Sequence, residues 1–194
     1  MRIANIIKSS IDVKERILND ANLLLKINEA AELIVKTYKQ GGRVFFCGNG
    51  GSAADAQHLA AELSGRFYFD RPPLAAEALH VNTSYITAVA NDYAYDVIFS
   101  REVDAFCKKG DVLVGISTSG NSANVLKAFE TAKGKGVLTI AMTGESGGKM
   151  ASISDILINI PSNDTPRIQE SHITIGHIIC QIVEEELFQS FKTK

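Results

Sequence analysis

Short apolar runs alternate with helical patterns along most of this chain of 194 residues. The apolar runs have the length of strands rather than helices and cover residues 44–47, 78–81, 112–116, 137–142 and 156–160. Helical patterns separate them at residues 52–64, 84–107 and 123–133, and a long final helix is expected from Thr165-Pro166 to about Phe188. This alternation is typical of a parallel sheet with helices on both faces. It predicts a doubly wound α/β fold with about five strands.

The residues before the first expected strand are helical throughout, as two helices with a break near residues 19–22. We expect a single domain over residues 1–194, composed of this N-terminal helical extension (1–40) and an α/β core (41–194). The extension and the final helix can form an oligomer surface, or they can simply cover the sheet.

Composition and charge exclude several classes of partner. The formal net charge is −2, so no basic surface favours nucleic acid or an anionic membrane. No run approaches the ~20 apolar residues of a membrane span, and the N-terminal isoleucines do not form the continuous apolar region of a signal peptide. The cysteines, Cys47, Cys107 and Cys180, are widely spaced and odd in number, which fits neither a zinc pattern nor a disulfide framework. A reducing cytoplasm is the expected location.

A loop rich in hydroxyl groups follows the apolar run 112–116 and precedes a helical pattern. Backbone N–H groups at the start of a helix have no partner within the helix, and the helix dipole favours an anion there. Four hydroxyl side chains add further donors, namely Ser117, Thr118, Ser119 and Ser122. An ordinary helix cap needs only one of them. The loop contains no lysine, so it is not a Walker A loop, and it favours a phosphorylated small metabolite.

A glycine-rich loop, Gly48–Ala53, follows the first apolar run. It matches the dinucleotide pattern G-x-G-x-x-G/A, with Asp70 about 20 residues further on, so an NAD site is one alternative. In the other interpretation the glycines let the backbone approach a sugar, which Asn49 and Ser52 then bind.

Two helical segments carry polar groups that can support chemistry. His58 and Glu62 share a face of the helix at 52–64, where they can be metal ligands, a ligand beside an acid/base, or a surface pair. Gln169 and His177 share a broad face of the final helix, whose other positions are rich in isoleucine. Buried polar groups need partners, which a metal, a substrate or, for His177, a backbone carbonyl can provide. Gly176 indicates that another element approaches closely, whereas His80 and His172 are interpreted as structural or surface residues.

Taken together, these segments resemble the sugar isomerase (SIS) family. The resemblance covers nearly the whole chain, including the helical N-terminal region. The matching segments are Cys47–Ser52, His58–Glu62 with Gly65-Arg66, Asn91-Asp92, Gly115–Ser122 with Asn124, Leu138–Met150 more loosely, and Arg167–Glu170 with His177.

The resemblance implies an aldose–ketose isomerase that acts on a phosphorylated seven-carbon sugar. Its reaction would convert D-sedoheptulose 7-phosphate to D-glycero-D-manno-heptose 7-phosphate, on the route to the heptose of lipopolysaccharide or capsule. The implied phosphate ligands are Ser52, Ser117, Thr118, Ser119 and Ser122. The implied sugar contacts are Asn49, Gly50, Gly51, Glu62, Asn91, Asp92 and Gln169. One zinc ion per subunit would be bound by His58, Glu62, Gln169 and His177. The resemblance also implies a homotetramer with sites at subunit boundaries, where Arg66 can reach a neighbour's site.

Such an isomerisation removes a proton from one carbon and returns it to the next through a cis-enediol. One carboxylate can do both, and a second group moves the proton between the oxygens. Glu62 is the candidate base and His177 the candidate acid, while zinc can act as a Lewis acid or hold the two groups in place. The alternatives are a family member that binds the bacterial replication initiator, a sugar-phosphate-sensing regulator and the NAD enzyme. The presence of both Glu62 and His177 favours the isomerase.

Overall fold

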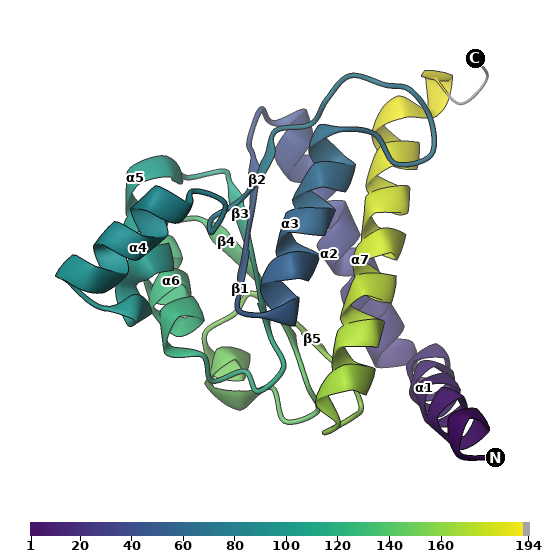
Figure 1. Ribbon diagram of the computed structural model, residues 1–194. Coiled ribbons are helices and arrows are strands. Elements are labelled where there is room, and N and C mark those ends of the chain that lie inside the picture. Colours follow the sequence, from purple (N-terminus) through teal and green to yellow (C-terminus); the bar gives the residue numbers. More distant parts are fainter. Residues whose placement is uncertain (192–194) are drawn as a thin grey trace.

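The computed structural model describes residues 1–191 and contains a five-stranded parallel sheet with helices on both faces (Figure 1). The strand order is β2-β1-β3-β4-β5. The strands are β1 (Val44–Gly48), β2 (Ala76–Ala78), β3 (Val112–Ser117), β4 (Leu138–Thr143) and β5 (Ile156–Asn159). Every residue of β1 and β3 is buried, because these strands have a neighbour on each side and helices on both faces. This burial explains their continuous apolar sequences and confirms the predicted doubly wound α/β fold.

The predicted position of the second strand, residues 78–81, is wrong. The structure has it at Ala76–Ala78, where it pairs with β1 alone at the edge of the sheet. Leu79 donates one more backbone hydrogen bond to Phe46, and its side chain is buried against the helices, so its apolar character reflects packing outside the strand.

The helices agree closely with their predicted ranges, except that the helical stretch expected over residues 84–107 is divided into two helices and a 3₁₀ turn. They are α1 (Arg2–Leu18), α2 (Ala21–Lys39), α3 (Gly51–Ser64), α4 (Thr83–Asp92), α5 (Ile98–Phe106), α6 (Ala123–Gly134) and α7 (Thr165–Phe188), with short 3₁₀ turns η1 (Tyr95–Val97), η2 (Gly148–Ser152) and η3 (Gln189–Phe191). The predicted break between the first two helices is confirmed, because the Asp20 carboxylate accepts a hydrogen bond from Leu23 N at 3.0 Å and caps α2. Pro166 lies in the first turn of α7, as predicted.

Two apolar cores lie on opposite faces of the sheet. Val44 and Phe46 of β1 point into the core formed with α2, α3 and α7, whereas Phe45 and Cys47 point into the core formed with α5 and α6. None of the helices within residues 1–191 is long and apolar enough to cross a membrane. The three cysteines are buried and free.

The topology brings two loops together at the carboxyl edge of the sheet. The chain leaves β1 toward β2 on one side, and β3 lies on the other side of β1. The loops that follow β1 and β3 therefore leave adjacent strands in different directions, and open α/β sheets bind ligands at such a point. The helices α3 and α7 both start at this edge and run side by side along one face (Figure 1).

Candidate active site

The glycine loop (Gly48–Ser52) begins α3 at the end of β1. Gly50 has φ +56° and ψ −123°, a conformation that only glycine adopts readily, and this turn leads directly into the helix. A Cβ atom at Gly48 would lie 2.6 Å from the carbonyl oxygen of Ser52, so the turn is also too tight for a side chain there. Ser52 is buried in the first turn of α3. The glycines thus permit a close turn between β1 and α3.

The hydroxyl loop (Ser117–Ser122) lies beside it, between β3 and α6. The hydroxyl groups of Ser117 and Ser122 are 2.8 Å apart, and the Ser119 hydroxyl accepts a hydrogen bond from the backbone N–H of Asn121. The N-cap residue Ser122 makes no side-chain capping hydrogen bond within the described residues, and among the first N–H groups of α6 that of Val125 donates to Asn124 Oδ1 at 3.0 Å. The arrangement brings together the hydroxyls and the helix N-terminus that the sequence proposed for a phosphate.

A pair of asparagines joins the glycine loop to the first turn of α6. Asn49 Nδ2 donates to Asn124 Oδ1 at 2.9 Å, and Asn124 Nδ2 donates back to Asn49 Oδ1 at 2.8 Å. The Tyr95 hydroxyl also donates to Asn49 Oδ1, at 3.0 Å. Asn124 is buried, so the pair fixes the glycine loop against the start of α6. Sequence reasoning missed the role of Tyr95, because its segment carries no motif.

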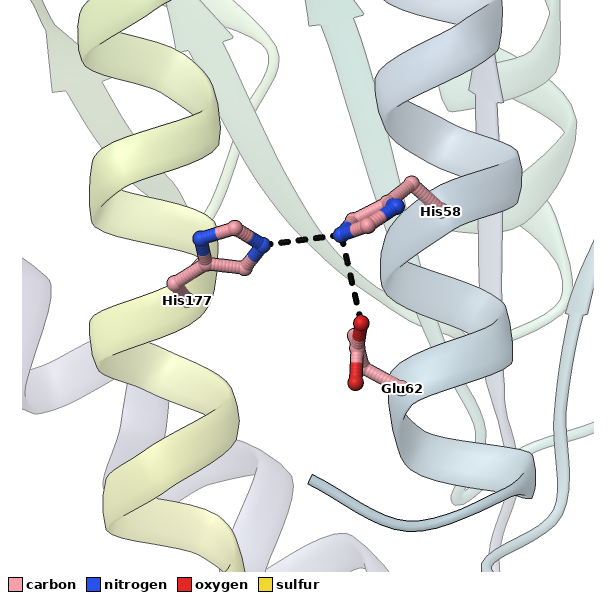
Figure 2. A group of neighbouring side chains, drawn as sticks. All are labelled: His58, Glu62 and His177. Atoms are coloured by element: carbon pink, nitrogen blue, oxygen red, sulfur yellow. Dashed lines mark hydrogen bonds and ion pairs between the residues drawn. The ribbon is translucent and has the colours of Figure 1, made fainter. Parts of the chain in front are cut away.

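Three potential metal ligands converge between α3 and α7 (Figure 2). His58 Nε2 lies 2.9 Å from His177 Nε2 and 3.2 Å from Glu62 Oε1, and the three ligand atoms all lie within 4.8 Å of one another. Figure 2 shows both rings and the carboxylate pointing into the space between the helices. We call these residues the His-Glu-His cluster. Because the His58 side chain is 49% exposed, a solute can reach it.

Packing between the two helices explains this convergence. Gly176 lies opposite Leu59, and a Cβ atom at Gly176 would lie 2.6 Å from the Leu59 methyl carbons, which confirms the close approach that was predicted. The next residue, His177, therefore faces His58 instead of the core. The Phe67 ring lies 5.6 Å from the His177 ring and forms one wall of the cluster, a contact that the sequence did not indicate.

Charge near the cluster comes also from Asp55, one helical turn before His58. Burial raises the pKa of the Asp55 carboxyl, whereas the neighbouring His58 lowers it. Its Oδ2 is buried and has no hydrogen-bond partner within the described part of the chain. This carboxyl adds an acidic group behind the first histidine.

The other candidate residues lie around these features. Gln169 lies at the first turn of α3, because a Cβ atom at Gly51 would come within 2.5 Å of its Nε2, and no hydrogen bond joins Gln169 to the cluster among residues 1–191. Asn91 and Asp92 end α4 and are exposed, with a hydrogen bond of 2.8 Å between their side chains. Arg66 is exposed in the loop after α3.

The NAD alternative loses the acidic residue that it requires. In that pattern the acid follows the second strand, where it binds the ribose. Asp70 is instead exposed in the loop before β2. The glycine loop therefore lacks the acidic residue that would complete a dinucleotide site.

The comparisons with known proteins agree with this geometry. The model of the SIS domain family matches residues 7–144, and the chain belongs to this family. It is 53% identical over 184 residues to a phosphoheptose isomerase of Aneurinibacillus thermoaerophilus, covering 95% of this chain and 93% of that protein. It is also 58% identical over 179 residues to one from Mycobacterium bovis, covering 92% and 91%. The solved phosphoheptose isomerase of Neisseria gonorrhoeae superposes with a TM-score of 0.89 at 44% identity, covering 95% of this chain and 97% of that one. Within the SIS family, the chain is one of the phosphoheptose isomerases.

Proposed function

We propose that this enzyme interconverts D-sedoheptulose 7-phosphate and D-glycero-D-manno-heptose 7-phosphate, an early step in heptose synthesis for lipopolysaccharide or capsule. The observation that carries the proposal is the convergence of Glu62 and His177 beside His58, with atoms within 4.8 Å of one another. Relatives at 53% and 58% identity bear the name phosphoheptose isomerase, which supports the same substrate class.

The distance from the hydroxyl loop and Ser52 to the His-Glu-His cluster suits a sugar whose phosphate is remote from its reacting carbons. We assign the phosphate to Ser52 and to the hydroxyl loop, and the sugar to Asn49, Gly50, Gly51, Asn91, Asp92 and Gln169. The cluster begins seven residues further along α3 than Gly51, or about 10 Å at 1.5 Å per residue. A phosphate on carbon 7 is similarly remote from carbons 1 and 2, where the reaction takes place.

The acid/base chemistry follows from the positions of Glu62 and His177. The Glu62 carboxylate removes a proton from carbon 1 of the ketose, which gives the cis-enediol, and then returns the proton to carbon 2 to form the aldose. His177 moves the accompanying proton between the oxygens on carbons 1 and 2. Both groups come from helices that pack tightly through Gly176 and Leu59, so their separation is fixed before the substrate binds.

The donor set of the His-Glu-His cluster fits zinc. Two imidazole nitrogens and one carboxylate are a set that catalytic zinc sites use, and the fourth position stays open for a further ligand such as Gln169. Bound zinc would polarise the oxygens of the substrate. A carboxylate that binds a metal tightly is a weaker base, so the two roles of Glu62 compete. We assign one zinc ion per subunit to His58, Glu62 and His177, with Gln169 as the fourth ligand once its amide turns from Gly51 toward the cluster.

A homotetramer with sites at subunit boundaries is the assembly that we propose. Its support is an apolar surface on α1, where Ile3, Ile6, Ile7 and Ile11 are each about half exposed or more. Water-exposed patches of this kind mark protein interfaces. Arg66, which is exposed in the loop after α3, can then reach a neighbour's site. The buried free cysteines support a cytoplasmic location.

The test is product formation from sedoheptulose 7-phosphate, followed by NMR at matched zinc content. We expect the wild type to convert the ketose and His177→Ala to lose nearly all activity. Ile178→Ala is the matched control, because Ile178 is the next residue of α7 and is 43% exposed. Zinc content, measured by mass spectrometry, should fall in His58→Ala and stay unchanged in the control. A folded, zinc-loaded wild type that forms no product would refute the isomerase and favour the partner-binding family member.

A further inference from the structure

An ion pair between two fully buried side chains lies next to the His-Glu-His cluster. Arg71, in the loop between α3 and β2, donates through Nε to Glu184 Oε1 of α7 at 3.0 Å, and both side chains are 0% exposed. Removing two charges from water can cost as much free energy as their attraction recovers, so a buried ion pair is by itself weak evidence for a gain in stability. Stability by itself is therefore a poor explanation for this pair, and its other contacts indicate its role.

The Arg71 guanidinium binds the end of α3. Its Nη2 donates to the backbone carbonyl of Glu62 at 2.9 Å, and its Nη1 donates to that of Leu63 at 2.7 Å and that of Gly65 at 3.1 Å. The last carbonyls of a helix have no partner within the helix, so a rigid cation at this point fixes the final turn. The turn that it fixes carries Glu62.

The Glu184 carboxylate binds the start of the following loop. Its Oε1 accepts from the backbone N–H of Phe67 at 2.9 Å, and its Oε2 accepts from that of Tyr68 at 2.7 Å. Phe67 is the residue whose ring lies against His177, and Glu184 follows His177 by seven residues, on the same side of α7. One carboxylate thus ties the loop after α3 to the helix that carries the candidate acid.

We propose that Arg71 and Glu184 are positioning residues that set the distance between Glu62 and His177. Neither touches the side chains of the cluster, so they act through the last turn of α3 and through Phe67. The inference rests on the proposed function for the identity of the reacting groups. Geometric errors of about 1 Å in such sites can reduce rates on the order of 100-fold.

The first variant is Glu184→Gln, which keeps the shape of the side chain and removes its charge. We expect kcat for sedoheptulose 7-phosphate to fall at least tenfold, with KM changed less than threefold, because the hydroxyl loop lies at the other end of the helices. Val183→Ala is the matched control: Val183 is the neighbouring buried residue of α7, so this change lowers stability without touching the pair. Unchanged kcat in Val183→Ala, at a temperature where both variants are folded, separates positioning from stability.

A second variant removes the pair without leaving an unpaired charge. Arg71→Met with Glu184→Leu replaces both ions by apolar groups, a change that often preserves or raises stability. We expect this double variant to fold and still to have a low kcat. Wild-type kcat in a stable double variant, or in Glu184→Gln, would overturn the proposal.

Zinc affinity provides a readout that does not depend on turnover. Competition with a chelator should show weaker zinc binding in Glu184→Gln and in the double variant than in Val183→Ala. If the wild type binds zinc but converts no substrate, the proposed function fails while this measurement still tests positioning. Equal zinc affinity in all variants, together with equal kcat where turnover occurs, would refute the role of the pair.

Discussion

The buried histidine His172 makes the stability of this protein fall in mild acid. It lies on α7 with no exposed surface, and its Nε2–H donates to the backbone carbonyl of Thr143 on β4 at 3.1 Å. Its Nδ1 has no hydrogen-bond partner within residues 1–191. Burial lowers the pKa of His172 to about 4 from its ordinary 6.5, because an imidazolium here would lose its hydration, and the Thr143 hydrogen bond offsets this only in part.

The sign and size of the effect follow from proton linkage. Between pH 6.5 and pH 4 the unfolded chain binds a proton at this residue and the folded protein does not, so the free energy of unfolding decreases as the pH falls. The contribution is fully present above the ordinary pKa. About 2 kcal/mol is lost by pH 5 and about 3 kcal/mol below pH 4.

Urea unfolding at pH 7.5 and pH 5 tests this expectation in the wild type and in His172→Gln. The glutamine keeps an N–H donor for the Thr143 carbonyl but does not titrate. We expect the wild type to lose about 2 kcal/mol more than the variant between the two pH values, at one protein concentration so that subunit association does not differ. Equal losses in the two proteins would show that His172 is not held neutral by burial.

Three further perturbations follow from the packing and charge of the molecule. Gly176→Ala should cost about 1–3 kcal/mol in urea unfolding and lower zinc affinity, because the new methyl group pushes Leu59 and α3 away from α7; wild-type values for both would contradict the close packing. Asn124→Ala should cost about 1–3 kcal/mol by leaving the Asn49 amide without its partner, and kinetics should show a higher KM as the glycine loop loosens. Burial, and secondarily the nearby Glu77 carboxylate, raises the pKa of Glu102 from 4.5 to about 7, so its stabilising contribution is present below pH 4.5 and is lost as the pH rises through 7. The wild type should therefore lose more stability than Glu102→Gln between pH 5 and pH 8, which thermal unfolding of both proteins at the two pH values will detect.

Much of the fold could be predicted because local patterns determine it. The buried strands β1 and β3 are continuous apolar runs, and α7 has its proline in the first turn and its isoleucines along its length, so their positions agree with expectation. The strand β2 could not be placed in the same way. It has three residues, Ala76-Glu77-Ala78, and it is held by pairing with β1 on one side only, so its own side chains carry little signal.

Local sequence patterns predicted the separate parts of the candidate site but not how those parts meet. The spacing of His58 and Glu62 placed them on one helix face, but it left open whether His177 faced a metal, a substrate or the core. In the structure His177 lies beside His58. The histidine that is buried in the core and donates to a backbone carbonyl, that of Thr143, is His172. The pairs Asn49–Asn124 and Arg71–Glu184 join segments far apart in the chain, and no local pattern indicates which polar residues meet across such distances.

The two histidines of the cluster lie 119 positions apart in the chain, and the second is on the last long helix. A nascent chain that has left the ribosome only as far as β5 holds a single histidine of the pair. Until α7 docks, Leu59 and Leu63 of α3 lack part of the cover that keeps them from water. The His-Glu-His cluster is therefore complete only when α7 is docked against α3, so binding of the proposed zinc ion would distinguish finished molecules from those whose last helix is undocked.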